Sequence, residues 1–559
     1  MENGDLDPAS LAQLRNPPQE TLIIEDENEL LSLKYFLATI DASQHTYINI
    51  RNVHNEQYPA NLLLSYDQIK KRAEQWSRIQ PMIHHMCPNL CVAYTGPYAS
   101  LDKCPECGES CYDPFQLEIS GGKIKFPRQK LCTIPLGPQI QALWRNPSTA
   151  AKMMHRRTVT KRILEEVQEN NGTVLVYDDL YHGSEYLEAC ICGDIKPDDT
   201  VMMGSMDGAQ LYCDKQSDCW IFIWIFIDLS PDLRYKKVHV MPGAIVPGPN
   251  KPKRMDSFLF PTFHHIAALQ KEGLTVWNSL KNELVMSNIF FYLTTADSPG
   301  SVYLTCLVGH SGACSYRLFC GMKGRHKPGV GHYYLALLKP NDYDMEGCNH
   351  PDLKAEDIRG SSMQDYNRKL TYVLESRNIK DYEERRRATG ISKPSMILGL
   401  PYTHRLSMTS SLAGDCMHVT NLNLGDLLVP LWRGKFQCDP NDSVALWPWA
   451  VLKGNTWIAN GRDVANARPY MPGCFDQPPR NIAEKINSGY KAKEFQSYFY
   501  GLAPALLYGL LPLPYWQNFC KLVHAVRILH QCSITRSQLL LAQTLLDEFH
   551  TEFEHLYVQ

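Results

Sequence analysis

The sequence predicts an α/β protein in which three strands, one helix and a fourth strand follow one another in the middle of the chain. Three β-prone segments, at residues 201–212, 219–229 and 236–246, come first. Residues 256–272 then carry apolar side chains at helical spacing, and residues 285–294 form another β-prone run. A cluster of cysteines precedes this region, and a mostly helical pattern follows it. We therefore expect an α/β core with the order β-β-β-α-β.

The length of the chain indicates several domains, because 559 residues exceed what one hydrophobic core supports. Apolar residues make up 44% and charged residues 21%, which is ordinary for a folded globular protein. We expect a mainly helical N-terminal region, a cysteine module, a helical connector, the α/β core and a largely helical last region, at residues 1–80, 81–125, 126–195, 196–340 and 341–559.

The net charge and the cysteine content limit the classes of function that the chain can have. The net charge of −3 means that binding to nucleic acid would depend on local basic segments. The nineteen cysteines follow no secretory leader, which favours reduced thiols and metal ligands over disulfides. The most apolar run, residues 220–227, is too short to span a membrane and is typical of a buried strand. We expect an intracellular protein without a membrane partner.

Helix signals occur on both sides of the predicted core. Residues 27–40 and 65–79 have helical periodicity, and Ser65 is suited to cap the second helix. Ser148 is expected to cap a helix that ends near Glu169, before Asn171-Gly172. In the last helix, apolar residues recur three and four positions apart: Leu539, Ala542, Leu546, Phe549, Phe553 and Leu556.

The strongest chemical motif is a set of paired cysteines with the spacing Cys87-x3-Cys91-x12-Cys104-x2-Cys107. Two close pairs separated by a short loop can supply four thiolates to one tetrahedral Zn²⁺. Gly108 is suited to the tight turn beneath the metal. The alternative is four unrelated buried thiols, and Cys111, His84 and His85 are further candidate ligands.

Two aspartates fall at the ends of predicted strands. Asp207 lies on the first strand of the core, and Asp297 follows the fourth. Carboxylates on neighbouring strands can hold the two metal ions of phosphoryl transfer. The alternative is that each aspartate caps a turn. Further along, Asp415 and His418 are three residues apart and would share one helical face. The alternative for this pair is a capping aspartate beside a partly buried histidine.

Further candidate ligands follow Asp297 at irregular spacing, namely His310, Cys314, Cys320, His326 and His332. Their types suit Zn²⁺, but their spacing does not define a site. Four basic segments can contact phosphates or simply face solvent, at residues 152–162, 251–254, 323–327 and 385–387.

Several motifs, in this order, resemble the transposases of the CACTA (En/Spm) superfamily in its fungal form. Before the core these are Cys87-Pro-Asn-Leu-Cys, Leu101-Asp-Lys-Cys-Pro-Glu-Cys-Gly and Tyr177-Asp-Asp-Leu-Tyr-His-Gly. Within and after the core they are Ser205-Met-Asp207-Gly-Ala-Gln, Pro247-Gly-Pro-Asn-Lys-Pro, Ala296-Asp297-Ser-Pro-Gly, Leu307-Val-Gly-His-Ser-Gly, Asp415-Cys-Met-His418 and Pro478-Pro-Arg-Asn-Ile-Ala-Glu-Lys-Ile-Asn-Ser-Gly-Tyr. The resemblance extends over nearly the whole chain from about residue 80.

The resemblance implies an RNase H-like catalytic core whose first part is residues 196–340. Asp207 and Asp297 would bind Mg²⁺ or Mn²⁺, Asp415 and His418 would act near the site, and a zinc-ribbon-like module would hold Zn²⁺. The partners would be the DNA of element ends and targets and a possible second copy of the chain, in the nucleus.

Two departures from the family pattern are apparent. The spacing Cys314-x5-Cys320 is wider than the family's second zinc site, and the third catalytic acid, a glutamate on a helix after the insertion, has no clear counterpart. Glu484 and Glu494 lie within the insertion segment. The resemblance as a whole implies a DNA transposase that uses metal ions to cleave and transfer DNA strands at the ends of a mobile element. We expect the insertion region to be truncated, and this 559-residue polypeptide, expressed alone, to bind DNA weakly without cleaving it. The alternative is a truncated or domesticated relic that binds DNA or a partner without catalysis.

Overall fold

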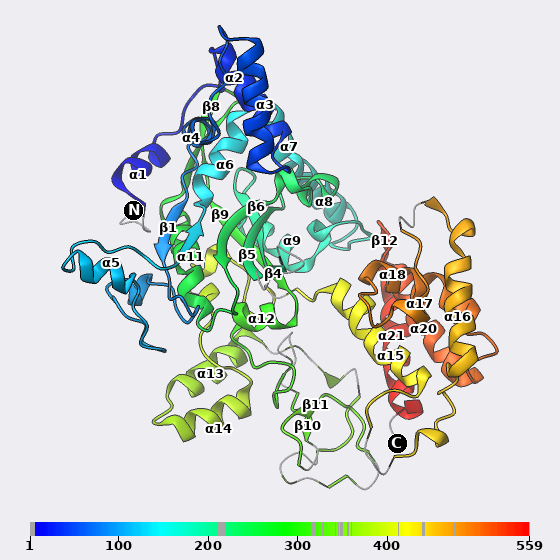
Figure 1. The fold of residues 1–559 in the computed structure, drawn as a ribbon. Helices are drawn as coiled ribbons and strands as arrows, with labels where there is room; N and C mark the ends of the chain where they lie inside the picture. The colour runs from blue at the N-terminus through cyan, green and yellow to red at the C-terminus, as the bar shows by residue number, and fades with distance from the viewer. Residues whose placement is uncertain are drawn as a thin grey trace. The chain divides into compact units, whose positions relative to one another are not determined.

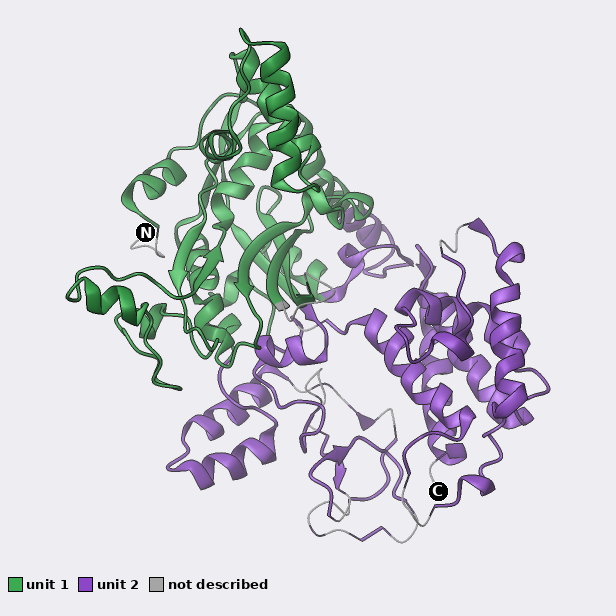
Figure 2. Cartoon of the chain, viewed as in Figure 1, with its two compact units in different colours: residues 1–162, 185–294, 395–407 green, residues 163–184, 295–394, 408–559 purple. Residues whose placement is uncertain are grey.

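The computed structural model describes residues 6–210, 218–315, 320, 322–326, 329–340, 343–344, 346, 350–354, 357–358, 360, 362–411, 413–438, 442–473 and 477–557 (Figure 1). The chain forms two compact units, coloured in Figure 2. Unit 1 consists of residues 1–162, 185–294 and 395–407, and unit 2 of residues 163–184, 295–394 and 408–559.

Unit 1 is built around a mixed six-stranded sheet with the order β1-β2-β6-β5-β4-β9. Its strands are β1 (Met82–His85), β2 (Lys130–Thr133), β4 (Thr200–Gln210), β5 (Asp218–Phe226), β6 (Met241–Pro247) and β9 (Ile289–Ala296). The neighbours from β1 to β4 pair antiparallel. The Thr200 N–H donates to the Asn288 carbonyl at 2.8 Å, so β4 and β9 begin side by side and run parallel.

The helix α11 (Met255–Glu272) covers one face of this sheet. Phe263 of α11 contacts Phe222 and Trp224 of β5, with ring centroids 5.8 and 6.2 Å apart. Glycines on the two neighbouring strands make room for these rings, because a Cβ on Gly204 or Gly243 would lie within 3 Å of the Phe222 or Trp224 side chain. The core of unit 1 therefore depends on large aromatic side chains on β5 opposite glycine on β4 and β6.

The remaining elements of unit 1 flank the sheet. Four helices precede it: α1 (Pro8–Arg15), α2 (Glu27–Ala38), α3 (Gln44–Gln57) and α4 (Tyr66–Ser77). Between β1 and β2 lie η1 (Gly96–Tyr98) and α5 (Pro114–Ile119). After β2 come α6 (Leu136–Arg145), α7 (Pro147–Met153), α8 (His155–Glu169) and α9 (Ser184–Ile191), of which α8 and α9 cross the division between the units. Later come α10 (Pro231–Arg234), η3 (Lys237–His239), the hairpin β7 (Leu274–Asn278) and β8 (Glu283–Ser287), η5 (Met396–Gly399) and η6 (Tyr402–His404).

Unit 2 is mainly helical. It contains β3 (Val176–Tyr177), η2 (Leu180–His182), α12 (Ser298–Thr305), the hairpin β10 (Arg325–His326) and β11 (Tyr333–Tyr334), α13 (Met363–Leu374) and α14 (Ile379–Thr389). The helical body, residues 417–557, comprises η7 (Met417–Asn423, a π-helix), α15 (Leu424–Arg433), η8 (Val444–Leu446), α16 (Gly454–Asn466), η9 (Arg468–Tyr470), α17 (Ile482–Lys485), α18 (Ala492–Ser497), η11 (Tyr498–Leu502), α19 (Ala503–Leu506), α20 (Leu513–Leu529), β12 (Ile534–Thr535) and α21 (Arg536–Tyr557).

The helical body has an aromatic core. Trp432, Trp449, Tyr498 and Phe499 are each at most 1% exposed. The predicted apolar face of the last helix packs against this core through Leu546, Phe549 and Phe553 of α21. This apolar face of α21 therefore packs within unit 2.

Several predicted elements are confirmed and others need correction. The helix at 65–79 is α4, and Ser65 forms a capping box with Gln68. The predicted helix capped by Ser148 is two helices, and the first is capped by Asn146, whose side chain accepts the Ser148 N–H. The strand expected from residue 236 begins at Met241, because η3 occupies Lys237–His239. The run at 285–294 is divided between β8 and β9, which belong to different sheets.

Candidate metal centre and acidic sites

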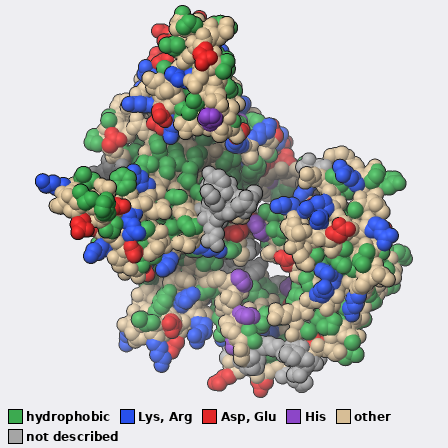
Figure 3. Space-filling view, in the orientation of Figure 1, with side chains coloured by type: hydrophobic (Ala, Val, Ile, Leu, Met, Phe, Trp, Pro, Cys, Tyr) green, Lys and Arg blue, Asp and Glu red, His purple; other side chains and the backbone are tan. Residues whose placement is uncertain are grey.

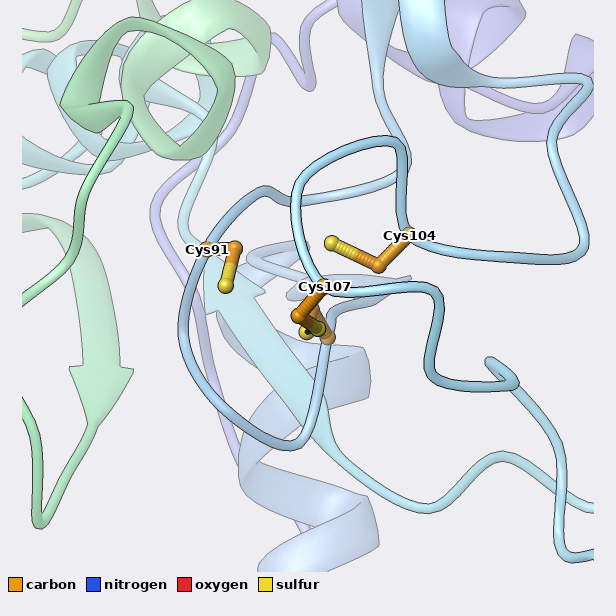
Figure 4. Close-up of side chains that lie close together, drawn as sticks. Cys91, Cys104 and Cys107 are labelled. Carbon is orange, nitrogen blue, oxygen red and sulfur yellow. Dashed lines mark hydrogen bonds between the residues drawn. The ribbon is translucent and has the colours of Figure 1, made fainter.

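The four predicted zinc ligands come together in unit 1. The Sγ atoms of Cys87, Cys91, Cys104 and Cys107 all lie within 4.8 Å of one another, and those of Cys87 and Cys107 are 3.5 Å apart. Figure 4 shows Cys91, Cys104 and Cys107 approaching from two loops. Four sulfurs about 2.3 Å from a central Zn²⁺ would be about 3.8 Å apart, so these residues fit a tetrahedral zinc site with four thiolate ligands.

Two tight turns bring the cysteines together. The Cys87 N–H donates to Val92, and the Cys104 N–H donates to Glu109. Leu90 has a φ of 54° and Gly108 a φ of 75°, which reverses the chain after each first cysteine. Backbone N–H groups of Asn89 and Glu106 point at the sulfurs of Cys87 and Cys104, each at 3.4 Å. At Cys87, burial raises the pKa of the thiol, and the hydrogen bond from the Asn89 N–H partly offsets this effect.

The thiol pKa values differ with burial. Burial, followed by the neighbouring cysteines, raises the pKa of Cys91 to about 12. In the exposed Cys107, a backbone hydrogen bond from Glu109 outweighs the smaller effect of burial and lowers the pKa to about 7. A divalent cation among the four sulfurs would offset the charge of the thiolates and deprotonate Cys91 near neutral pH.

The cysteine module, residues 82–128, is attached to the start of α11. The Lys253 and Arg254 N–H groups donate to the carbonyls of Leu90 and Cys91, each at 3.0 Å. The Ala93 N–H donates to the Ser257 hydroxyl at 2.9 Å. These hydrogen bonds couple one metal-binding loop to the helix that covers the central sheet.

Asp207 lies on β4, and Asp297 directly follows β9, the neighbour of β4 in the sheet order. Asp207 is an exposed residue near the carboxyl end of β4, and its carboxylate accepts the Gly208 N–H at 2.7 Å. Asp297 directly follows β9 and caps α12, where its carboxylate accepts the Gly300 N–H at 2.7 Å. The capping role considered from the sequence is therefore present at Asp297. The division between the units falls just before Thr295, and the convergence of the two carboxylates stays a prediction.

Asp415 and His418 form a joined pair in unit 2. One carboxylate oxygen of Asp415 accepts the His418 backbone N–H at 3.0 Å, and the other lies 2.6 Å from His418 Nδ1. The carboxylate therefore caps the start of η7 and also orients the imidazole. When Nδ1 carries the proton, the neutral Nε2 accepts a hydrogen bond, and only in the doubly protonated ring would Nε2 donate to a phosphate oxygen.

The candidate zinc ligands that follow Asp297 do not form a cluster like that of the four cysteines in the described part of the chain. Among the described residues, the only group of three or more metal-ligand side chains is the Cys87–Cys107 cluster. The Cys314 thiol instead points at the carbonyls of Arg387 and Ala388. His326 packs against Tyr333 with ring centroids 4.7 Å apart. Residues 316–319, between Cys314 and Cys320, lie outside the described part of the chain.

The two spare glutamates have other partners. Glu494 is 4% exposed and accepts hydrogen bonds from the Arg480 guanidinium at 2.6 and 2.7 Å. Its remaining contacts are the Arg480 and Lys491 N–H groups, so this carboxylate is committed to holding α18 in place. Glu484 accepts a hydrogen bond from the Asn481 side chain. Neither arrangement is that of a metal ligand.

Sequence reasoning missed one buried ion pair in unit 1. Arg156 belongs to a predicted basic segment, yet it is 1% exposed and donates to Asp228 at 2.7 Å. The guanidinium also donates to the carbonyls of Lys196, Pro197 and Asp199. Arg156 is thus a structural residue, and only its neighbours remain available for phosphate contact. No local sequence signal separates it from Arg157.

Comparison with known proteins returned no match to a protein-family model and no match to a curated protein. Among the described residues, no helix is both long and apolar enough to cross a membrane. Side chains of both charges are interspersed on the face shown in Figure 3, in keeping with the small net charge.

Proposed function

We propose that the chain is a DNA transposase that cleaves and joins DNA strands with Mg²⁺ or Mn²⁺ held by Asp207 and Asp297. The observation that carries the proposal is the parallel pair β4 and β9. Asp207 lies near the carboxyl end of β4, and Asp297 directly follows the carboxyl end of β9. Parallel neighbours that begin together bring their carboxyl ends to one edge of the sheet, where two carboxylates can share metal ions.

The order of elements supports an RNase H-like core. Strands β4, β5 and β6 are followed by α11 and then by β9, with the hairpin β7–β8 inserted before β9. This is the predicted β-β-β-α-β order with one addition. The motif resemblance to CACTA transposases adds support, because its two aspartate motifs fall on the strands that the sheet places next to each other.

The metal ions would activate the attacking oxygen and stabilise the leaving oxygen of the scissile phosphodiester. The chain's own contribution would be to hold these ions with fixed carboxylates and to position the DNA. The Asp415 carboxylate would keep the His418 ring in one orientation, so that Nε2 presents a single hydrogen-bonding group to DNA or water. The four-cysteine site would hold Zn²⁺ and stabilise the loop that contacts α11.

Nuclear localisation and assembly with a second copy of the chain accompany the proposal. A transposase acts on chromosomal DNA, and a second copy of the chain would supply one active site for each of the two element ends. Both remain part of the proposal.

Manganese binding tests the proposal directly. Mn²⁺ titrations followed by electron paramagnetic resonance would compare the wild-type chain with Asp207→Asn and Asp297→Asn. We expect each variant to lose roughly tenfold or more in affinity, because each carboxylate supplies charge and a ligand atom. Metal binding is the preferred readout because it depends on Asp207 and Asp297 themselves. Strand cleavage would also depend on whether a third catalytic acid is present.

Asp194→Asn is the matched control, since Asp194 is an exposed aspartate of the same unit that lies before β4. Equal Mn²⁺ affinity in the wild type and in both test variants would refute the proposed catalytic site. A Mn²⁺-dependent nicking activity on DNA, lost in Asp207→Asn and retained in Asp194→Asn, would support strand cleavage.

A further inference from the structure

A group of cationic side chains from two distant segments lies together in unit 1. Lys152 and His155 belong to the region where α7 ends and α8 begins, and Lys236, Lys237 and His239 lie in and beside η3. The pKa of the buried His239 is lowered by burial first and then by the nearby Lys152 and Lys236. The pKa of the Asp232 carboxyl is lowered first by a hydrogen bond from the Ser230 hydroxyl and to a smaller extent by the charges of Lys236 and His155. The Arg156–Asp228 ion pair joins the start of α8 to the segment that leads to η3, so the two groups of cations belong to neighbouring parts of unit 1. We call Lys152, Lys236 and Lys237 the basic face.

A buried ion pair holds the two segments together. Arg156, in the first turn of α8, donates to Asp228, which follows β5, and both side chains are at most 3% exposed. The Arg156 N–H also donates to the Asp228 carbonyl at 3.3 Å. Loss of either partner would leave an uncompensated buried charge, so the pair favours the arrangement in which α8 lies against the segment that follows β5.

The acidic side chains near this face pair with groups other than Lys152 and Lys236. Asp198 pairs with Arg157 at 2.6 Å, and Asp41 pairs with Lys237. Asp232 accepts a hydrogen bond from the Ser230 hydroxyl. Among the described residues, Lys152 and Lys236 have no carboxylate within 4 Å. An anion is the ligand that such a surface attracts.

One exposed aromatic and one exposed aliphatic side chain flank the two lysines beside η3. Tyr235 is 59% exposed and Val238 is 76% exposed, on either side of Lys236 and Lys237. Tyrosine hydroxyls and lysines are common donors to DNA phosphates. The composition of this segment suits a nucleic-acid backbone better than a small free anion, which would need an enclosing site.

The basic face lies at the opposite end of the sheet from Asp207. The β4–β5 register runs from Met202 opposite Phe226 to Asp207 opposite Ile221. These two pairs are five residue steps apart along the strand, which corresponds to about 17 Å, or about five base pairs of DNA at 3.4 Å each. Asp228 and η3 lie beyond the Phe226 end. A ligand on the basic face is therefore separate from a phosphodiester at Asp207.

We propose that the basic face of Lys152, Lys236 and Lys237, with Tyr235 and Val238 beside them, binds the phosphate backbone of duplex DNA that flanks the reacting strand. This inference rests on the proposed transposase function. The exposed Asp41–Lys237 pair does not oppose it, because surface ion pairs contribute little and a phosphate can replace the carboxylate. The contact supplies affinity without reading the base sequence.

The experiment is a DNA-binding titration with the full chain. Fluorescence anisotropy of a labelled 30-base-pair duplex would be measured between 50 and 200 mM KCl for the wild type and for Lys152→Gln/Lys236→Gln. We expect the double variant to bind about tenfold more weakly at 100 mM KCl. The slope of log affinity against log salt should fall by roughly 2, because two phosphate contacts are lost.

Lys34→Gln/Lys71→Gln is the matched control, because both lysines are exposed and lie on α2 and α4 of the same unit. This variant removes the same charge and should keep the wild-type affinity and slope. Equal losses in both double variants would mean that only net charge matters, and no loss in Lys152→Gln/Lys236→Gln would exclude the basic face. Tighter binding to the single strand than to the duplex would also overturn the proposal.

The result is separable from the proposed catalytic function. Lys152→Gln/Lys236→Gln should retain wild-type Mn²⁺ binding, because the lysines are remote from Asp207. A wild-type chain that binds Mn²⁺ through Asp207 but shows no duplex binding would overturn this inference alone. A basic face that binds DNA in a chain without Mn²⁺ binding at Asp207 would overturn the catalytic proposal alone.

Discussion

The cysteine module and the helical body hold their folds by different means. The module buries a small cluster whose main members are the cysteines themselves, together with Val92 and Tyr94. The helical body buries a large set of aromatic and aliphatic side chains around Trp432, Trp449 and Phe499. A short segment with so little apolar area needs a cross-link, whereas a large core is stable by burial. Removal of the metal should therefore destabilise the cysteine module and leave the stability of the helical body unchanged.

Loss of the metal ligands is expected to have the largest effect. Cys104→Ser/Cys107→Ser should remove about one zinc ion per chain and destabilise the module by several kcal/mol, on the order of 5 kcal/mol. The helical body should keep its unfolding transition. Elemental analysis and hydrogen exchange of residues 82–128 would measure both effects. Cys192→Ser, at an exposed cysteine, is the control, and unchanged zinc in the double variant would place the ligands elsewhere.

The next effect concerns the buried carboxylate of Glu494 in the helical body, which is 4% exposed. Burial tends to raise the pKa of Glu494, but hydrogen bonds from Arg480 and from the Lys491 N–H outweigh it and lower the pKa to about 2. Because the folded-state pKa lies below the ordinary value of 4.5, the stabilisation is complete above about pH 4.5 and is lost as pH falls toward 2. Glu494→Gln should cost about 2–3 kcal/mol at pH 7.

Urea unfolding between pH 3 and 7 would measure this contribution. The difference between the wild type and Glu494→Gln should shrink as the pH is lowered. Glu484→Gln, at an exposed glutamate ten residues earlier, should change stability little at any pH. A pH-independent difference for Glu494→Gln would show that the ionised pair is not the source of the stability.

A smaller effect is expected at the capping pair of η7. Asp415→Ala removes the acceptor for the His418 N–H and should cost about 1 kcal/mol, whereas Asp415→Asn retains a capping oxygen and should cost less. Both variants remove the carboxylate from His418 Nδ1. Thermal unfolding measures the cap, and the His418 ring resonances in NMR measure the orientation. Equal stability of Asp415→Ala and the wild type would contradict the cap.

The smallest effect on zinc is expected at the second cysteine pair. Cys314→Ser/Cys320→Ser should leave the zinc content at the wild-type value, because neither thiol joins a group of three metal ligands among the described residues. Elemental analysis alongside Cys104→Ser/Cys107→Ser is the measurement. If Cys314→Ser/Cys320→Ser instead lost a second equivalent of zinc, unit 2 would also contain a metal cross-link. The contrast between unit 2 and the cysteine module would then disappear.

The sequence by itself determined the features that depend on near neighbours in the chain. The Cys87–Cys107 cluster was predictable because each cysteine pair closes its own turn. The Ser65 capping box and the Asp415–His418 pair were predictable because their groups are three residues apart. The continuous apolar run predicted the buried strand β5, and the helical spacing of apolar residues predicted α11. Such patterns indicate which side chains are buried but not what they pack against.

Only the tertiary structure decided features that depend on distant partners. The apolar run at 285–294 is continuous in sequence, but it is divided because Asn288 donates hydrogen bonds to Asp199 as the chain passes from the hairpin to the central sheet. Arg156 and Arg157 are indistinguishable in sequence, yet Asp228 lies where only Arg156 reaches it. The proposed site depends on the position of β9 beside β4, where Phe291 of β9 packs against Trp224 with ring centroids 6.1 Å apart and the Thr200 N–H donates to the Asn288 carbonyl. Local pattern carries no information about such pairings, because their energy comes from surfaces that meet only in the folded chain.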